Sequence, residues 1–189
     1  MANIYALIEK FFKNDNFSKL EIYNEISLQH ELGIFLRGHL PNFRIQFERN
    51  VKYFNLNGIV KTKKEIDIVI FDSTCTEKYS IELKHPLNGQ NPEQMYSFIK
   101  DIKFSEELVS KELGGFNSAF CIILVRDKVF YSGTKKSGIY QYFRTGKELS
   151  GKVEKPTGEQ VKQIELNGKY KIDWKYINET YSYCVLQIK

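Results

Sequence analysis

Three side chains that can support hydrolytic chemistry lie on two short apolar stretches of the chain. Glu82 and Lys84 are two residues apart within residues 79–84, and side chains at that spacing leave the same face of a strand. Asp67 is the only charged residue in the apolar stretch 66–71, where an unpaired charge is costly to bury. Two carboxylates can hold a hard divalent cation that activates water, and a nearby ammonium can stabilise charge on an attacked phosphorus. These residue types point to metal-dependent hydrolysis of a phosphodiester.

The two stretches that carry these residues have the patterns of neighbouring β-strands. Residues 66–71 are almost continuously apolar and β-branched, which predicts a strand covered on both faces. Residues 79–84 alternate and end before Pro86, and a polar turn separates the two stretches. We therefore expect a hairpin-like pair in which Asp67 lies beside Glu82.

A helix and a further strand are predicted before this pair. Ser18 offers an N-cap with Glu21 at the capping-box position, and helical spacing continues to about Gly38. Apolar and polar residues then alternate through residues 43–53, which is the period of a half-buried strand, and Asn57–Gly58 supplies turn chemistry.

After the pair, a second long helix is expected from Asn91 to about Leu113, followed by a buried strand at residues 119–125. Beyond this strand the pattern loosens, with short strand-like segments at residues 170–174 and 181–188.

The predicted elements define one domain over residues 1–189 with a mixed α/β fold. A central mixed sheet is flanked by helices, an amphipathic helix lies near the N-terminus, and residues 127–189 form a β-rich C-terminal elaboration.

The spacing Asp67-x14-Glu82-x-Lys84, set between two helices, resembles the PD-(D/E)XK, or restriction-endonuclease-like, nuclease superfamily. The resemblance covers about residues 17–126 and implies a core of helix, three strands, helix and strand. One departure is that Ile66 stands where the motif's name has proline.

The resemblance also implies the roles of the motif residues. Asp67, Glu82 and the Leu83 carbonyl would hold Mg²⁺, for which Mn²⁺ would substitute, and Lys84 would be the catalytic cation. The expected activity is hydrolysis of phosphodiester bonds by a Mg-activated water, in DNA rather than RNA, as an endonuclease or an exonuclease.

Many members of this superfamily draw a further glutamate from the first core helix, and helical spacing selects Glu25 as that catalytic and metal-binding residue. One stripe at spacings of three and four contains Ile22, Glu25, Gln29, Leu32 and Leu36. Glu31 falls on a different face, where solvent is expected. Gln29, one turn after Glu25, is predicted to support the site or contact the substrate.

Further polar candidates lie on the second helix and on the first strand. Gln94 and Asp101 are seven residues apart at the border of an apolar stripe, so both would flank a cleft. The resemblance favours Gln94, because related nucleases often place a polar residue of this helix near the scissile phosphate. Glu48 is a weaker candidate on the polar face of its strand.

Composition agrees with an anionic partner and with a reducing compartment. The net charge of +5 permits nucleic-acid binding but does not require it. Cys75, Cys121 and Cys184 are odd in number and widely separated, which disfavours disulfides and a zinc site. The apolar runs are far shorter than the ~20 residues of a membrane span. We therefore expect a cytoplasmic protein with no membrane partner, and whether it forms a homodimer stays open.

Two alternatives remain at the level of sequence. The same fold could serve as a catalytically inactive nucleic-acid-binding module. The charged residues could also form a buried ion-pair cluster in a protein-interaction domain, with Lys84 neutralising Asp67 and Glu82.

Overall fold

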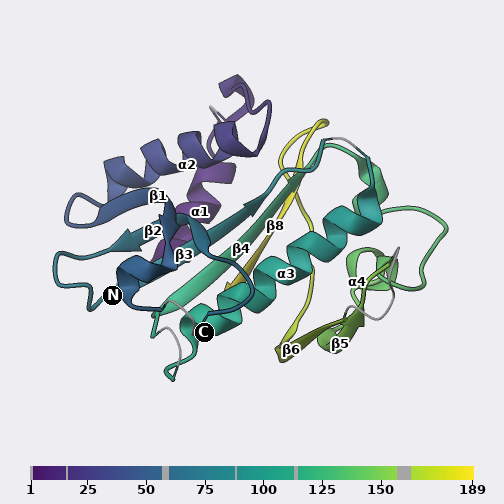
Figure 1. Cartoon of the computed structure of the whole chain (residues 1–189). Helices are drawn as coiled ribbons and strands as arrows, with labels where there is room; N and C mark the ends of the chain where they lie inside the picture. The colour runs from purple at the N-terminus through teal and green to yellow at the C-terminus, as the bar shows by residue number, and fades with distance from the viewer. Residues whose placement is uncertain (1, 16, 57–59, 88, 113–114, 157–162) are drawn as a thin grey trace.

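A mixed β-sheet forms the centre of the structure. The computed structural model describes residues 2–15, 17–56, 60–87, 89–112, 115–156 and 163–189. Within these residues the central sheet has six strands in the order β1-β2-β3-β4-β8-β7, and helices cover it (Figure 1). The predicted turn at Asn57–Gly58 lies outside the described residues.

Five of these strands correspond to segments that the sequence predicts. They are β1 (Arg44–Asn50), β2 (Glu65–Phe71), β3 (Lys78–Lys84), β4 (Ser118–Val125) and β8 (Ser182–Ile188), and β7 (Lys175–Tyr176) is a short edge strand. β1, β2 and β3 are successively antiparallel, β4 is parallel to β3, and β8 is antiparallel to β4. The first strand is shorter than expected, because residues 51–54 form a 3-10 turn.

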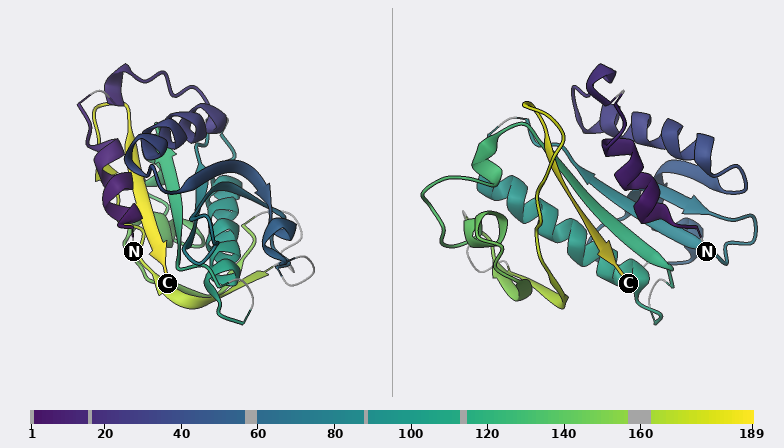
Figure 2. Two further views of the ribbon diagram at one scale, coloured as in Figure 1. Left: turned by 90° about the vertical axis from the view of Figure 1, so that its left-hand side faces the viewer. Right: turned by 180° about the vertical axis from the view of Figure 1, so that it is seen from behind.

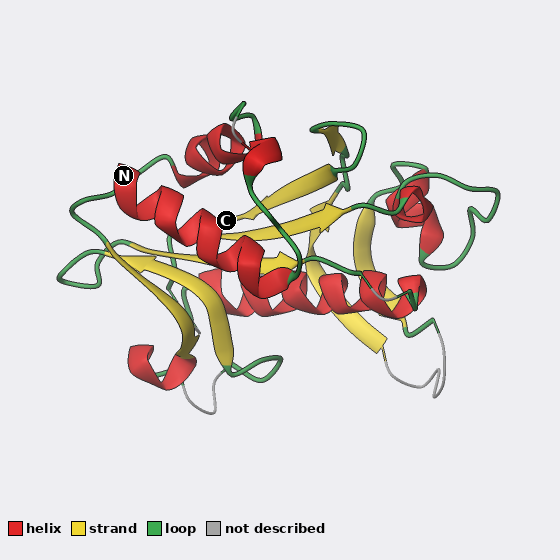
Figure 3. Cartoon of the chain, turned by 90° about the horizontal axis from the view of Figure 1, so that it is seen from above, coloured by secondary structure: helices red, strands yellow, loops and turns green. Residues whose placement is uncertain are grey.

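Helices cover both faces of the sheet, and successive side chains of each strand point alternately to one face and the other. α1 (Ile4–Phe12) and α2 (Glu25–His39) pack on the face that presents Ile81 and Leu83. α3 (Asn91–Val109) packs on the opposite face, which presents Cys121 and Ile123. Figure 3 marks these helices in red against the yellow strands. Glu82, whose neighbours Ile81 and Leu83 face α2, therefore points towards α3.

The helix that the sequence predicts from Ser18 to about Gly38 begins later than expected. Ser18 lies in a 3-10 turn, η1 (Phe17–Lys19), and α2 begins at Glu25. The N-cap is Asn24, which accepts from the backbone of Ser27 while the Ser27 hydroxyl accepts from the backbone of Asn24. This reciprocal pair satisfies two donors at the helix start, which is the role assigned to Ser18 and Glu21.

The C-terminal part adds a small layer beside α3. It contains η3 (Lys128–Phe130), α4 (Tyr140–Arg144) and a separate hairpin of β5 (Leu149–Glu154) and β6 (Gln163–Tyr170). The right-hand view of Figure 2 shows this layer on the side away from α1 and α2. The strand predicted at residues 170–174 is wrong, because β6 ends at Tyr170 and the next strand begins at Lys175.

Among the helices of the described residues, none combines the length and the apolar character that crossing a membrane requires.

Candidate functional site

Asp67 and Glu82 meet where β2 and β3 separate. The register of the two strands runs from Phe71↔Lys78 to Ile68↔Ile81, which would bring Asp67 opposite Glu82 at the next position. There the N–H of Leu83 donates to the Oδ2 atom of Asp67 at 2.8 Å. This side-chain oxygen takes the place that a backbone carbonyl has in a regular strand pair. The prediction that the two carboxylates lie side by side is confirmed, and Asp67 is held in place by the strand that carries Glu82.

Lys63 joins these two carboxylates, and the sequence analysis missed it. Its Nζ lies 2.5 Å from Asp67 Oδ1 and 2.6 Å from Glu82 Oε2. Lys63 lies before β2, four residues ahead of Asp67, in a run of three lysines among residues 61–64. That run indicates nearby positive charge, but it does not say which lysine turns inward. In the alternative of a buried ion-pair cluster, the cation that contacts both carboxylates is therefore Lys63 and not Lys84.

The electrostatics of this pair depend on burial. The side chain of Glu82 is fully covered, and burial, together with the negative charge of Asp67, raises its pKa well above the ordinary value. Burial lowers the pKa of Lys63, but the facing Glu82 and Asp67 carboxylates outweigh that effect and raise it overall. Two carboxylate oxygens thus share one cation in a poorly solvated place, where opposite charges attract more strongly than in water.

Lys84 belongs to a second group of charges at the end of β3. Its Nζ is 3.5 Å from Glu25 Oε1 and 3.5 Å from Asp101 Oδ2. Burial lowers the pKa of Lys84, but Asp101 and Glu25 more than compensate, so the pKa lies above its ordinary value. The Lys84 ammonium is therefore held between α2 and α3 beside the Asp67–Glu82 pair.

Glu25 takes part in the site from the first turn of α2. It is the first residue of the helix and turns its carboxylate inward to Lys84, as its place in the helical stripe predicts, but its side chain is still 41% exposed. Its Oε2 accepts from the backbone N–H of His85 at 3.0 Å, directly after Lys84. This contact ties the end of β3 to the start of α2 and leaves part of the Glu25 carboxylate open to solvent.

Gln29 links α2 to β1 and β2. Its Nε2 donates to Glu48 Oε1 at 2.6 Å and to the Asp67 carbonyl at 2.7 Å. A small recess of about 40 Å³ lies beside this link, lined by Glu25, Ile26, Gln29, Glu48, Asp67 and Leu83. The recess has the volume of about one water molecule or one dehydrated ion.

Glu48 holds an uncommon backbone conformation at this recess. Its φ of 47° is left-handed, although glutamate rarely adopts that region, and it stands inside β1. Such a conformation costs roughly 1–3 kcal/mol and is found preferentially at functional positions. The cost is offset locally by the hydrogen bond from Gln29. Glu48 is therefore a stronger candidate than its place in the strand pattern suggests.

The other predicted residues lie at different depths around the site. Asp101 is buried against Lys84, so of the two candidates on the second helix it is the one that contacts the charged group. Gln94 is half-buried two turns earlier on α3. The N–H of Leu83 is bonded to Asp67, and Leu83 lines the recess, whereas the role of its carbonyl stays a prediction.

In the described part of the chain, no set of three or more His, Cys, Asp and Glu side chains is arranged to hold a metal ion. The donors that do converge are the two carboxylates of Asp67 and Glu82 on one ammonium. Carboxylate oxygens are the donors that Mg²⁺ and Mn²⁺ prefer, so this pair fits such an ion in chemistry.

Comparisons of the chain with protein-family models, with curated proteins and with solved structures found no match.

Lys63→Met is expected to destabilise the fold, because it leaves the fully buried Glu82 without its cation. Breaking a buried ion pair costs about 3–5 kcal/mol, and the partial exposure of Lys63, 32%, places the expected loss near the lower end, about 3 kcal/mol. Chemical denaturation measures this loss. Lys64→Met is the matched control, since it removes the neighbouring exposed lysine. Equal stability of the two variants would show that the Lys63 bridge contributes nothing.

Asp101 should make stability depend on pH. Burial raises the pKa of Asp101 to about 7, and Lys84 offsets this only in part. The unfolded chain releases this proton near pH ~4. Protonated Asp101 therefore adds to the free energy of unfolding. This contribution is fully present below about pH 4 and is lost as the pH rises through about 7.

Thermal melting between pH 5 and pH 8 should detect this proton. In that interval we expect the free energy of unfolding to fall by about 1 kcal/mol per pH unit through Asp101. Asp101→Asn, which cannot ionise, should flatten the decline, whereas Asp15→Asn, at an exposed position, should leave it unchanged. The same pH slope in all three proteins would contradict the assignment.

Proposed function

We propose that this protein is a metal-dependent nuclease of the PD-(D/E)XK type that hydrolyses phosphodiester bonds in DNA. The observation that carries the proposal is that Asp67 and Glu82, from adjacent strands, converge on one cation. Lys84 leaves the same strand as Glu82, two residues further on, and is held at the same end of the sheet. These are the three residues on which the resemblance rests.

The arrangement of the elements supports a restriction-endonuclease-like core. α2, the meander of β1, β2 and β3, then α3 and β4 follow the order helix, three strands, helix, strand. β4 lies parallel to β3 after a crossover through α3, as a connection through a helix requires. The three motif residues lie where β2 and β3 separate, and Asp67 and Leu83 line the small recess beside that point.

The metal in this proposal would be held by Asp67 and Glu82, with Glu25 the third candidate because its carboxylate is partly open. When bound, Mg²⁺ would supply a positive charge against the phosphate and a more acidic water. Lys63 would then leave the position between the carboxylates. It lies on the solvent side of the pair, with a third of its side chain exposed, so it can move outward without unfolding a strand.

Lys84 performs a separate task in this scheme. Its ammonium keeps its proton, because Asp101 and Glu25 hold its pKa above the ordinary value. It therefore acts as a fixed positive charge, placed to stabilise the negative charge that develops on phosphate oxygens as water attacks. Asp101 positions Lys84 from α3, and Glu25 positions it from α2.

A cleavage assay tests the function. Labelled single-stranded and double-stranded DNA is incubated with the protein in Mg²⁺, in Mn²⁺ or in a chelator, with labelled RNA beside them. The proposal expects cleavage of DNA that needs the divalent ion. Cleavage that continues undiminished in the chelator would contradict the metal-dependent mechanism.

The second candidate is a protein-interaction domain with a buried ion-pair cluster. The bridge from Lys63 favours it, because this one ammonium already contacts both carboxylates without any ion from solution. This candidate predicts no affinity for DNA at low salt, where phosphate contacts are strongest. A third candidate, an inactive nucleic-acid-binding module, predicts binding at low salt with no cleavage.

A further inference from the structure

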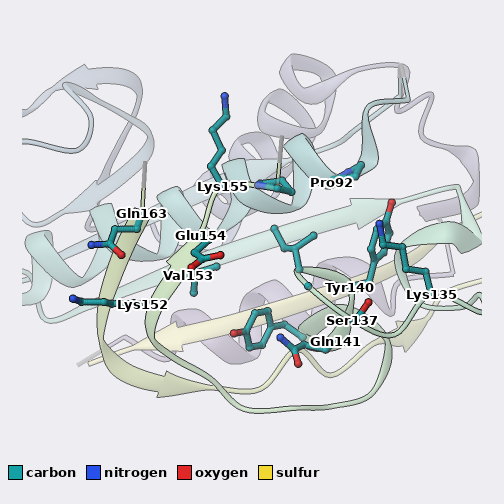
Figure 4. A pocket seen from close by; sticks show the side chains of 14 residues that line it. Pro92, Lys135, Ser137, Tyr140, Gln141, Lys152, Val153, Glu154, Lys155 and Gln163 are labelled. Carbon is teal, nitrogen blue, oxygen red and sulfur yellow. The ribbon is translucent and has the colours of Figure 1, made fainter. Parts of the chain in front are cut away.

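A pocket outside the candidate site lies between α4, the β5–β6 hairpin and the first turn of α3. Its volume is about 460 Å³, and Figure 4 shows it from close by. The buried side chains of Ile139 and Val153 form its apolar inner part, and Pro92 closes it from α3. Among the lining residues that the structure describes, Pro92 alone lies outside the C-terminal layer, which therefore supplies the other described residues of the pocket.

The charges at the pocket are predominantly positive. Its lining contains Lys135, Lys152 and Lys155 against one acidic residue, Glu154. Figure 4 places Lys152 and Lys155 on the hairpin side and Lys135 on the opposite side, beside Tyr140. Lys155 lies 3.9 Å from Glu93, whereas Lys135 and Lys152 are exposed. Lys152 extends from β5 away from Tyr140, so Lys135 is the lysine that stands beside the ring, while the other two lysines add to the positive field around the pocket.

Tyr140 gives the pocket a fixed aromatic wall. The guanidinium carbon of Arg144 lies 4.1 Å from the centre of its ring, so a cation supports the ring. Arg144 also donates to the carbonyls of Val129 and Lys135, each at 2.8 Å, which fastens the preceding loop. Lys135 Nζ stands 5.3 Å from the same ring centre. A flat ring and an ammonium are therefore held close together in a fixed geometry.

We propose that this pocket binds one nucleotide unit of a single-stranded nucleic acid, with the base against Tyr140 and the phosphate beside Lys135. Stacking on aromatic rings combined with lysine contacts to the backbone is the usual way in which proteins hold single strands. The choice of a nucleic acid as the ligand rests on the proposed function, whereas the base-plus-phosphate chemistry rests on the pocket alone.

The two sites are joined by α3. Pro92 lines the pocket and Asp101 contacts Lys84, so nine residues of one helix separate them, about 14 Å along its axis. Nine residues are also about two and a half helical turns, so Pro92 and Asp101 lie on opposite sides of α3, and a strand that joins the two sites passes around the helix as well as along it. A second hollow on the outer side of α3, which shares Lys155 and Gln163 with the pocket, continues the depression along the helix. The pocket therefore binds the part of the strand that lies beyond the scissile bond.

Binding in a chelator, where no cleavage occurs, tests the pocket lysine. Fluorescence anisotropy with a labelled oligothymidylate should show about fivefold or more weaker binding for Lys135→Ala. The slope of log affinity against log salt should fall by about 0.7, the contribution of one phosphate contact for a single strand. Lys111→Ala removes one exposed lysine elsewhere and should bind as the wild type does. An equal loss in both variants would overturn the pocket in favour of overall charge.

A second comparison tests the aromatic wall and the source of the nucleotide. Tyr140→Leu should weaken oligonucleotide binding about tenfold, whereas Tyr140→Phe should bind normally, because a base stacks on either ring. Unlabelled thymidine monophosphate should compete more strongly than inorganic phosphate, and the oligonucleotide should compete most strongly. Equal competition by phosphate and monophosphate would overturn the base contact. If the monophosphate competes as well as the oligonucleotide, the ligand of the pocket is a free nucleotide and not a nucleic-acid strand.

This test separates failure of the pocket from failure of the proposed function. If oligonucleotide binding depends on Tyr140 and Lys135 while the protein never cuts DNA, the nuclease proposal fails and the pocket stands. If Mg²⁺-dependent cleavage occurs while these variants bind and cut normally, the pocket proposal fails and the nuclease stands.

Discussion

Lys84→Ala is expected to lower the rate of DNA cleavage in Mg²⁺ by about 10²–10³-fold, the usual effect of removing one group that stabilises transition-state charge. Lys84 is held by Glu25 and Asp101 at 3.5 Å from each, so its ammonium has a fixed place beside the Asp67–Glu82 pair. The loss should appear mainly in kcat, because the charge it stabilises develops only during attack. Single-turnover cleavage of labelled DNA measures the rate.

Two controls separate this loss from a defect in folding. Lys84→Ala leaves the buried Asp101 without its cation, so its melting temperature is measured beside the wild type. Lys111→Ala, an exposed lysine just after α3, carries the same change of charge and should cut normally. A folded Lys84→Ala protein that cleaves within threefold of the wild-type rate would refute the assigned role.

Mn²⁺ is expected to raise the melting temperature of the wild type by about 5–10 °C, but not that of Asp67→Asn. At an ion concentration of about 100 times the dissociation constant, binding stabilises the folded state by about 2.7 kcal/mol, and each kcal/mol raises the melting temperature of a chain of this size by about 2–4 °C. Asparagine keeps the size of Asp67 and removes the charge that attracts the ion. The measurement is thermal melting with no DNA present, so it is independent of activity.

The outcome is judged against two further proteins. Asp15→Asn removes an exposed carboxylate and should respond to Mn²⁺ as the wild type does. Lys63→Met removes the ammonium that competes for the ion, so its temperature rise should be at least as large as that of the wild type. The same rise in Asp67→Asn and in the wild type would remove the metal from this site.

Strand patterns could be predicted well from the sequence because each central strand has its own signal. Residues 66–71 and 119–125 are apolar on both faces, and that pattern corresponds to β2 and β4, which are buried along almost their whole length. The hairpin of β5 and β6 was missed, because several of its residues are exposed and it lacks a clear apolar alternation. Its place in the fold is set by packing against α3, which the local sequence does not describe.

The start of α2 shows how two local signals can compete. Ser18 and Glu21 have the spacing of a capping box, and so do Asn24 and Ser27 if serine takes the second position. Tertiary packing decides between them, since Phe17 and Ile22 are buried in the core while residues 17–19 form only a short turn. Because α2 begins at Glu25, this residue lies at the exposed start of the helix and not in the interior of the predicted stripe.

The candidate site could be predicted in its motif residues but not in their partners. Spacing alone brought Asp67 beside Glu82, because register in a hairpin follows from sequence distance. Which cations neutralise them depends on where a loop turns, and Lys63 belongs to a loop. The sequence also placed Asp101 below Gln94, although burial makes Asp101 the residue in contact with Lys84.

The position of β8 changes how separable the motif-bearing core is from the rest of the chain. Without β8, β4 would become an outermost strand of eight covered residues whose backbone groups lack partners on one side. Exposed apolar strands of that kind adhere to other chains. The segment after Arg126 therefore protects the edge of β4 from pairing with other chains. A fragment that ends at Arg126 would aggregate instead of folding as a smaller version of this protein.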